Sequence, residues 1–413
     1  MLDFIRKSTW SFLSVAIKSA SSIIINKIIA VQYGTAGISL LAHFQNLISL
    51  ITQIPNDGVN RGIIKYWSGK ELGNIEKNKI LFMGFIMNLI ILFISLIILF
   101  FLKQYFFRDF NFIIKVPELI VLIIAISIYI IHLFILSVIL SFQKIKIYSV
   151  INAITSIIVV VATAITAQGN VLKITLYAYL IAQSAGIFFT IAYSIRNKLI
   201  RFSYTGNQRK TISRLGEFVL MAISVLVFGK LTDFIVRDYA IQSFGLNQTG
   251  LWQSVVKISD GYLMLFINTV GIVYYPQVSA LLLNSNKLRY YLHDVLKITV
   301  PVTLIGLSII YFAREPIIII LFNSEFLPAA DLVPMQLIGD FFCILAYLLT
   351  YIISAQSRTR VFISLQAGSA VLYVLLIYIL THYSGIQGIP QAHAIRYSIL
   401  VLILIFLNKR ILF

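Results

Sequence analysis

Residues 38–66 read ISLLAHFQNLISLITQIPNDGVNRGIIKY, a segment with the length and apolar content of a membrane-spanning helix. Asp57 and Arg61 lie inside it, although a charge at the bilayer centre costs roughly 2.5–3.5 kcal/mol on insertion scales. A helical wheel at about 100° per residue groups four polar residues within about 60°, namely Asn46, Gln53, Asp57 and Asn60. Pro55 interrupts the helix and is expected to kink it. We interpret the stripe as lining a cavity, with a hydrogen-bonded seam between helices and an internal Asp57–Arg61 pair as the alternative.

The composition extends this reading to the whole chain. Of its 413 residues, 59% are hydrophobic and 12% are charged, and the mean hydropathy is +0.93. A soluble domain carries about 25% charged residues, so a soluble fold is excluded. The apolar segments predict an all-α membrane protein with about twelve transmembrane helices of about 20 residues or more. They are expected near residues 8–31, 38–66, 79–102, 117–142, 149–167, 172–195, 214–240, 248–280, 293–314, 331–356, 361–382 and 388–408.

Basic residues set the expected orientation. With the N-terminus in the cytoplasm, about 21 Lys and Arg residues flank the helices on that side and about 6 on the other. Both termini are therefore expected in the cytoplasm. The most basic loop divides the chain into an N-terminal six-helix lobe (1–195), a cytoplasmic linker (196–213) and a C-terminal six-helix lobe (214–413).

The two halves show a weak internal repeat. At an offset of about 213 residues, four residues of the first half match four of the second. These are Gly37, Leu50, Ile54 and Gly58, with Gly250, Leu263, Ile267 and Gly271. Six helices per half keep both halves in the same orientation, so the relating axis would run along the membrane normal.

Further charges lie in other predicted spans, where charged side chains face a bundle interior or a water-filled cavity. Lys18 is near mid-depth in the first helix and is the better cavity candidate, whereas Lys27 is near the outer end and can snorkel. Lys230, Asp233 and Arg237 share one helical face, as do Gln253, Lys257, Asp260 and Asn268. Asp340 and Arg396 are single charges that are expected to pair with each other.

Signals of other functions are absent from the sequence. It has no Walker A loop, no zinc-protease motif, no nucleophile-elbow motif and no large soluble domain. One cysteine, Cys343, excludes a disulfide framework and a multi-cysteine metal site. The formal net charge of +18 is scattered over short loops, which disfavours nucleic acid and suits an anionic lipid substrate. We expect a transporter rather than an enzyme, with no cofactor and no metal.

The chain resembles the polysaccharide-type flippases of the multidrug/oligosaccharidyl-lipid/polysaccharide (MOP) exporter superfamily, in particular the Wzx group. The resemblance covers essentially the whole chain. It is carried by the stretch GLWQSVVKISDGY at residues 250–262, by Lys18 and Asn26-Lys27 before Tyr33-Gly34 and Gly37, by Gln336-Leu337-Ile338-Gly339-Asp340, and by Gln391-Ala392.

This resemblance implies two six-helix lobes around a central cavity that opens alternately to each side, as in the MATE transporters. The implied substrate is an oligosaccharide linked through pyrophosphate to undecaprenol, with an O-antigen polymerase and a chain-length regulator as possible partners. His43-Phe44-Gln45-Asn46 stands where a common-antigen flippase is expected to carry an arginine near position 45, so an O-antigen unit is favoured.

The buried residues then take two expected roles. Cations would attract pyrophosphate by roughly 4 kcal/mol per charge at 4 Å and an effective dielectric near 20, before desolvation. The expected substrate-binding residues for pyrophosphate and sugar are Lys18, Asn46, Arg61, Lys230, Lys257 and Arg396. The candidates for ion coupling or gating are Asp57, Asp233, Asp260 and Asp340, among which the sequence does not choose.

Three other functions compete with this hypothesis. A cation-coupled multidrug antiporter of the same superfamily would need a cavity rich in acidic and aromatic groups, but buried cations here are at least as numerous as buried anions. A membrane-embedded O-antigen polymerase or glycosyltransferase usually has a large outer loop, which this chain lacks. A non-transporting assembly scaffold would leave charge pairs at mid-membrane depth unexplained.

Overall fold

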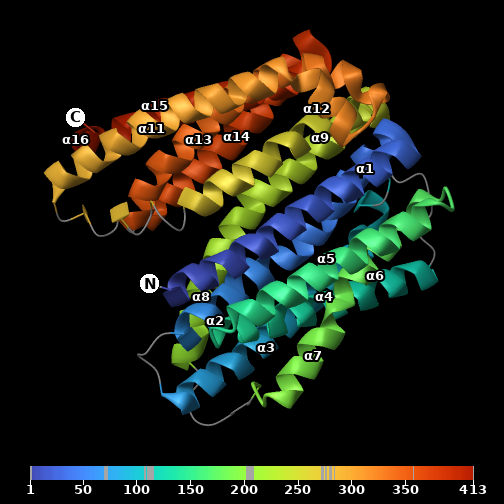
Figure 1. Ribbon diagram of the computed structural model, residues 1–413, viewed down its shortest axis with the longest axis vertical. Coiled ribbons are helices and arrows are strands. Elements are labelled where there is room, and N and C mark those ends of the chain that lie inside the picture. The colour runs from blue at the N-terminus through green and yellow to red at the C-terminus, as the bar shows by residue number, and fades with distance from the viewer. Residues whose placement is uncertain are drawn as a thin grey trace. The chain divides into compact units, whose positions relative to one another are not determined.

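A computed structural model describes residues 2–68, 73–106, 108, 116–200, 209–270, 274, 277–278, 281–282, 284–356 and 358–412. This part of the chain is almost entirely helical and contains no strand. Its first half comprises α1 (Leu2–Gln53), η1 (Ile54–Asn60), α2 (Arg61–Ser68), α3 (Asn74–Phe106), α4 (Val116–Ser141), α5 (Ile145–Ala167), α6 (Leu172–Ser184) and α7 (Gly186–Arg196). The second comprises α8 (Arg209–Val225), η3 (Leu226–Leu231), α9 (Thr232–Thr269), α11 (Ser285–Phe312), α12 (Arg314–Leu321), η5 (Ser324–Asp331), α13 (Val333–Ala355), α14 (Thr359–Ser384), η6 (Gly385–Gln387), α15 (Gly388–Leu407) and α16 (Lys409–Leu412) (Figure 1).

The predicted all-α membrane fold is confirmed. Nine helical stretches of the described chain are long and apolar enough to cross a membrane. Three of them, Leu13–Trp67, Thr211–Ile267 and Thr359–Leu407, are 55, 57 and 49 residues long. Because one crossing needs about 20 residues, each of these three can cross twice. Large apolar side chains stand exposed on these helices, Phe101 at 76% and Phe312 at 82%, as expected where lipid is the solvent.

Two glycines divide the longest helices. Gly34 in α1 has φ 62° and Gly245 in α9 has φ 78°, the left-handed region that glycine adopts without a steric penalty. The first kink falls at the predicted turn Tyr33-Gly34-Thr35. Each lies after the first predicted span of its half, and the two glycines are 211 residues apart, whereas the weak sequence repeat has an offset of about 213.

Pro55 lies in a wide helical turn rather than at a simple kink. Residues Ile54–Asn60 form a π-helix, η1, between α1 and α2. Proline lacks an N–H and its ring clashes with the carbonyl one turn earlier, so a wider turn relieves the clash without ending the helix. This turn presents the adjacent residues Asn56 and Asp57.

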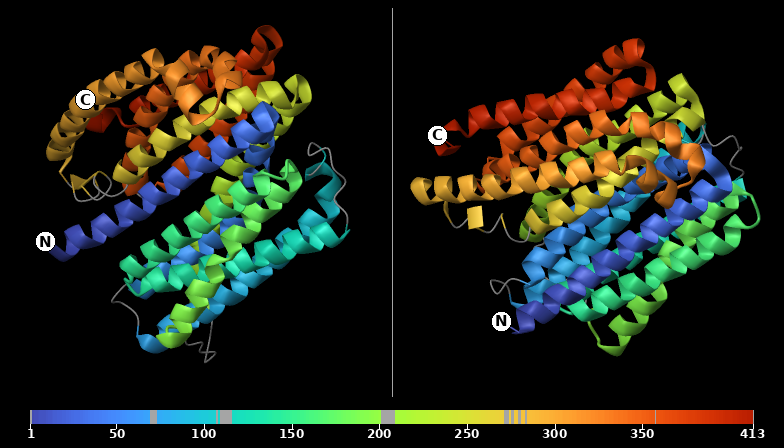
Figure 2. Two further views of the ribbon diagram at one scale, coloured as in Figure 1. Left: turned by 45° about the vertical axis from the view of Figure 1, so that its right-hand side comes forward. Right: turned by 45° about the horizontal axis from the view of Figure 1, so that its top comes forward.

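The contacts divide the chain into two compact units (Figures 1 and 2). The first unit contains residues 1–33 and 40–234, and the second contains residues 34–39 and 235–413. In the first unit, α4 packs against α6 and α7, and α5 against α6. In the second unit, α15 packs along both α13 and α14.

Apolar side chains fill both units. The core of the first unit includes Val59, Ile63 and Val138, all fully buried. The core of the second unit includes Val278, Ile352 and Leu404, also fully buried.

By contacts, α8 belongs to the first unit, although the sequence assigned residues 214–413 to the C-terminal lobe. It packs on η1 and on α2, where Gly58 and Gly62 let the helices approach closely. A Cβ on Gly58 would lie 3.1 Å from Cβ of Ala222, and one on Gly62 would lie 2.9 Å from Cδ2 of Leu215. Of the predicted linker 196–213, residues 196–200 end α7 and follow it, residues 209–213 begin α8, and residues 201–208 lie outside the described residues.

Candidate functional site

The first unit contains a cavity of about 590 Å³. Its walls come from α1, η1, α2, α4, α5 and α6, and its lining is rich in hydroxyl and amide groups. This volume falls within the roughly 300–1,000 Å³ typical of small-molecule sites. The sequence predicted a polar cavity between two lobes, whereas the lining of this cavity comes from the first unit alone.

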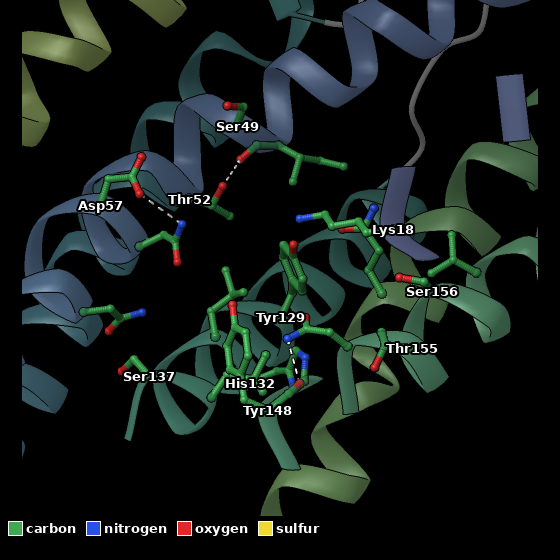
Figure 3. Close-up of a pocket in the computed structure, with 18 of the residues that line it drawn as sticks. Lys18, Ser49, Thr52, Asp57, Tyr129, His132, Ser137, Tyr148, Thr155 and Ser156 are labelled. Atoms are coloured by element: carbon green, nitrogen blue, oxygen red, sulfur yellow. Dashed lines mark hydrogen bonds between the residues drawn. The ribbon is translucent and has the colours of Figure 1, made fainter. Parts of the chain in front are cut away.

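Lys18 enters this cavity from α1 (Figure 3). In the described chain no acidic side chain forms a salt bridge with its ammonium group. Ser21 and Ser22, about one turn further along α1, line the same wall. An ammonium group within a membrane segment needs water or an anion to offset its desolvation. The cavity therefore presents a cation that is available to an anionic ligand.

Asp57 and Arg61 lie on another part of the lining. Arg61 Nη2 is 2.9 Å from Asp57 Oδ1, with Arg61 67% and Asp57 27% exposed at their side chains. Gln53 Nε2 also donates to Asp57 Oδ2 at 2.8 Å. The internal pair expected from the sequence is thus present, and both partners line the cavity. An ion pair this exposed is held weakly, so an anion can compete with Asp57 for the guanidinium.

Aromatic side chains form much of the remaining wall. Tyr129 and His132 come from α4, Tyr148 from α5 and Tyr179 from α6. Gln45 Nε2 donates to the hydroxyl of Tyr179 at 3.1 Å. Tyrosine combines an apolar ring with a hydroxyl that donates and accepts, which suits a sugar ring with its hydroxyl groups.

His132 has a packing role as well as a place in the wall. Its Nδ1 is 3.4 Å from the Thr190 hydroxyl on α7. A Cβ on Gly186 would lie 2.5 Å from its Cε1, so only glycine leaves room for the ring. This agrees with the sequence-based preference for a packing histidine.

The other predicted residues of the first unit lie elsewhere. Asn46 is buried, at 7% exposed, and does not line this cavity. Lys230 lies in η3 and Asp233 at the start of α9, both also outside its lining. The structure thus brings together Lys18, Asp57 and Arg61, and not Asn46, Lys230 or Asp233.

The remaining predicted residues belong to the second unit. Lys257 and Asp260 lie in α9, Asp340 in α13 and Arg396 in α15. Asp340, Asp260 and Arg396 are close enough to Cys343 to interact with it electrostatically. The nearest recorded partner of Asp340 across helices is instead His393, whose Nε2 lies 2.9 Å from Asp340 Oδ1, while Arg396 donates from Nε to the Ser369 hydroxyl at 2.7 Å.

Sequence reasoning missed two groups of residues. The tyrosines at 129, 148 and 179 were overlooked because the charged residues of α4, α5 and α6, namely Glu118, Lys146 and Lys173, lie in the first turn of each helix and the rest of each helix has none. His393 was overlooked although it lies three residues before Arg396, on the same helical face. The spacing Tyr129-x-x-His132, which places two polar rings on one face, was a signal that could have found the first group.

No metal centre is formed by the described residues: no three His, Cys, Asp or Glu side chains lie close enough to hold an ion.

No family model matches this sequence. Two curated relatives, the Lipid III flippases of Escherichia coli (strain K12) and Shigella flexneri, are each 22% identical to it over 413 residues. Each match covers 96% of this chain and 96% of the relative.

Solved structures share the fold. The Lipid II flippase MurJ in an inward closed conformation superposes with a TM-score of 0.71 at 16% identity, over 98% of this chain and 87% of MurJ. An inward-facing MATE family transporter of the MOP superfamily superposes with a TM-score of 0.70 at 14% identity, over 96% of this chain and 94% of the transporter. The chain is therefore a multi-pass membrane protein whose fold is that of the MurJ and MATE structures.

Proposed function

We propose that this protein is a flippase for an oligosaccharide linked through pyrophosphate to undecaprenol. In this proposal it moves the glycan from the cytoplasmic to the periplasmic leaflet of the bacterial inner membrane by alternating access. The observation that supports it most is Lys18, an ammonium group in a polar cavity with no acidic partner in the described chain. Both curated relatives are named as Lipid III flippases, which points the same way.

The chemistry of the cavity suits such a head group in two respects. Lys18 and Arg61 supply positive charge against the single lining carboxylate, Asp57, so the lining favours an anion such as pyrophosphate. The tyrosine, serine, asparagine and glutamine side chains can hydrogen-bond sugar hydroxyls. Of the predicted binding residues outside this cavity, Asn46, Lys230, Lys257 and Arg396 remain proposals for other stages of the transport path.

We further propose an O-antigen repeat unit as the cargo. This choice rests on His43-Phe44-Gln45-Asn46, where an arginine was expected for a common-antigen flippase. In the structure, Gln45 lines the cavity and bonds Tyr179, so this position contributes a neutral amide to the wall. An O-antigen polymerase and a chain-length regulator are proposed as partners on the same grounds.

The multidrug antiporter is the second candidate, since MATE transporters share the fold. A cationic drug would meet Lys18 and Arg61 in this cavity, and like charges repel. The lining thus favours the flippase over an exporter of cationic drugs.

Reconstituted vesicles test the proposed function. The purified protein is placed in liposomes with a polyprenyl-pyrophosphate glycan, and a glycosidase outside digests only the outer leaflet. Without flipping, only the glycolipid molecules in the outer leaflet are digested. If the protein flips them, molecules from the inner leaflet also reach the glycosidase, and digestion should approach completion. Digestion that stops at half, in vesicles that nevertheless export a cationic dye, would contradict the flippase and favour the antiporter.

A further inference from the structure

The second unit contains a buried carboxylate that is fully engaged by hydrogen-bond donors. Asp340 in α13 has no solvent exposure. The Ser259 hydroxyl donates to its Oδ2 at 2.6 Å, and the Tyr262 hydroxyl donates to the same oxygen. Gln336 Nε2 donates to Oδ1 at 3.1 Å. Two helices, α9 and α13, thus supply three neutral donors to one carboxylate.

The fourth partner is a histidine from a third helix. His393 Nε2, on α15, lies 2.9 Å from Asp340 Oδ1. A Cβ on Gly339, the residue before Asp340, would lie 2.1 Å from Cδ2 of that ring. Glycine at 339 therefore makes room for the imidazole, which is a sign of a built site rather than a chance contact. The histidine side chain is 15% exposed and the aspartate side chain 0%, so a proton can reach the pair through the histidine.

Other ionisable groups lie near the Asp340–His393 pair, and each has contacts of its own. Arg396 on α15 donates from Nε to the Ser369 hydroxyl at 2.7 Å. Its guanidinium lies 4.8 Å from the Tyr373 ring centre and 4.9 Å from that of Tyr397. The Tyr397 ring also lies edge-on to His393, at 4.9 Å between ring centres. The guanidinium is thus occupied by a hydroxyl and two aromatic faces.

The remaining facing groups come from α9, α12 and α13. Asp260 and Cys343 are close enough to share the electrostatic field of Asp340 and Arg396. Arg314 lines a small cavity of about 10 Å³ together with Ser259 and Tyr262, two of the donors to Asp340. A cavity of about this size is near the minimum that holds one water molecule. The Ser259 and Tyr262 hydroxyls thus also border this small cavity, whose other lining residues are apolar apart from Arg314.

The donor count favours a proton over a metal cation at this site. An ionised carboxylate has about four lone-pair positions, and four donors already occupy those of Asp340. A sodium ion would have to displace several of them. Among these donors, histidine is the type that changes charge near neutral pH. A proton can therefore bind without disturbing any of the four contacts.

We propose that Asp340 and His393 form a proton-binding site that couples transport by this protein to a proton gradient. The proton adds to Nδ1 of His393, and Nε2–H keeps its hydrogen bond to Asp340. The pair then passes from one net negative charge to none, and loss of the same proton restores the negative charge. Because the two states differ in buried charge, a proton gradient biases the protein between them. This inference rests on the proposed flippase function and selects one site from four candidate carboxylates.

Nitrogen-15 NMR of histidine tests the proton site directly. The full-length protein in nanodiscs contains five histidines, so labelling gives few signals. The spectrum of His393→Gln identifies the signals of His393 by their loss. We expect those signals to change from the neutral to the charged form as the buffer is acidified, with the protein still folded. His393 held in a single protonation state throughout the titration would overturn the proposal.

Transport under a pH gradient tests the coupling. In glycan-flipping vesicles, acidifying the periplasmic side should change the wild-type rate by about tenfold or more. His393→Gln should flip at one rate with or without the gradient, whereas His382→Gln, an exposed histidine on α14, should respond like the wild type. A wild-type rate that ignores the gradient would overturn the coupling and leave the flippase standing.

Absence of flipping in every variant would instead count against the proposed function. The NMR titration would still judge the proton site in that case, because it needs no substrate. Asp340→Asn gives a second check on folding, since an amide keeps the shape of the side chain. Its His393 signals should move to a different titration midpoint, and an unchanged midpoint would overturn the pairing.

Discussion

Gly339 and His393 lie on neighbouring helices so close together that a methyl group on Gly339 would lie 2.1 Å from Cδ2 of the imidazole. No atoms pack at that distance, so any larger residue at 339 must push the ring away from Asp340. This relationship turns a glycine into a positioning residue for the buried contact between His393 and Asp340.

Gly339→Ala should displace His393 and destabilise the protein by about 1–3 kcal/mol, the usual cost of overpacking. A lower midpoint of thermal unfolding in detergent would measure it, together with a shift of the His393 NMR signals. Gly368→Ala, on α14, is the matched control because nothing lies within 4 Å of its added methyl group. Equal unfolding midpoints for both variants would show that α13 and α15 are not packed as described.

Lys18→Gln should weaken binding of a pyrophosphate-linked glycan by about tenfold to a hundredfold, because a charge-assisted contact contributes roughly 1.5–3 kcal/mol. Lys18→Arg should retain most of the binding. Lys173→Gln serves as the control, since Lys173 is outside the cavity and pairs with Glu118 at 2.5 Å. Titration of the ligand against protein in nanodiscs measures all three. Loss of affinity in Lys173→Gln alone would contradict the assignment.

Asp57→Asn and Arg61→Ala should change the affinity in opposite directions. Removing the carboxylate frees the guanidinium of Arg61 for the ligand, whereas removing Arg61 takes a cation from the lining. At about 1 kcal/mol for a hydrated charge pair at 4 Å, each shift should be roughly fivefold. The same binding titration measures both. A decrease of similar size in both variants would mean that the pair only shapes the cavity.

Arg61→Ala and Lys257→Ala together should abolish surface polysaccharide in a strain that depends on this protein, while the protein still reaches the membrane. Lys257 belongs to the second unit, so the double variant examines both units in one cell. Immunoblotting of membranes supplies the folding control. Full-length polysaccharide on such cells would remove both residues from the proposed binding set.

A disulfide between η1 and α8 should form readily and stop transport. A Cβ on Gly58 would lie 3.1 Å from Cβ of Ala222, close to the roughly 3.5–4.5 Å of disulfides. The double variant Gly58→Cys with Ala222→Cys is made in a Cys343→Ala background, which removes the single native cysteine. We expect oxidation to halt flipping and a reductant to restore it, because alternating access requires packed helices to part.

The control pairs Gly58→Cys with Gly216→Cys, since Gly216 on α8 has no atom within 4 Å of its added Cβ. This pair should not cross-link. Normal flipping by the oxidised Gly58/Ala222 pair would mean that η1 and α8 stay packed throughout transport.

The sequence predicted the fold in most respects because membrane spans are long and uniformly apolar. The predicted segments 117–142 and 172–195 differ from the helices by at most one residue at each end, with α6 and α7 continuing each other. Local departures from a regular helix were harder to predict, because they depend on single residues. Pro55 was expected to produce a kink, but its helix widens into a π-turn instead. The short helices α12 and η5 lie where a plain connection was expected.

The candidate site was predicted only where a charge marked it. Lys18, Asp57 and Arg61 were identified because lipid excludes unpaired charge, and this exclusion is strong enough to read from one sequence. Tyr129, Tyr148 and Tyr179 are common in membrane helices for other reasons, and only their convergence in space reveals them. Asp340 was identified, but its partner was not, because the pairing depends on the room that Gly339 leaves between α13 and α15.

Photocross-linking tests the central claim most directly, namely that the cavity of the first unit holds the anionic head group. A photoreactive amino acid at Ser22, on the cavity wall about one turn from Lys18, should label radioactive pyrophosphate-linked glycan, and Lys18→Gln should reduce the labelling. The same group at Ile165, which is 63% exposed on the outside of α5, should label it little. Strong labelling at Ile165 with none at Ser22 would contradict the account.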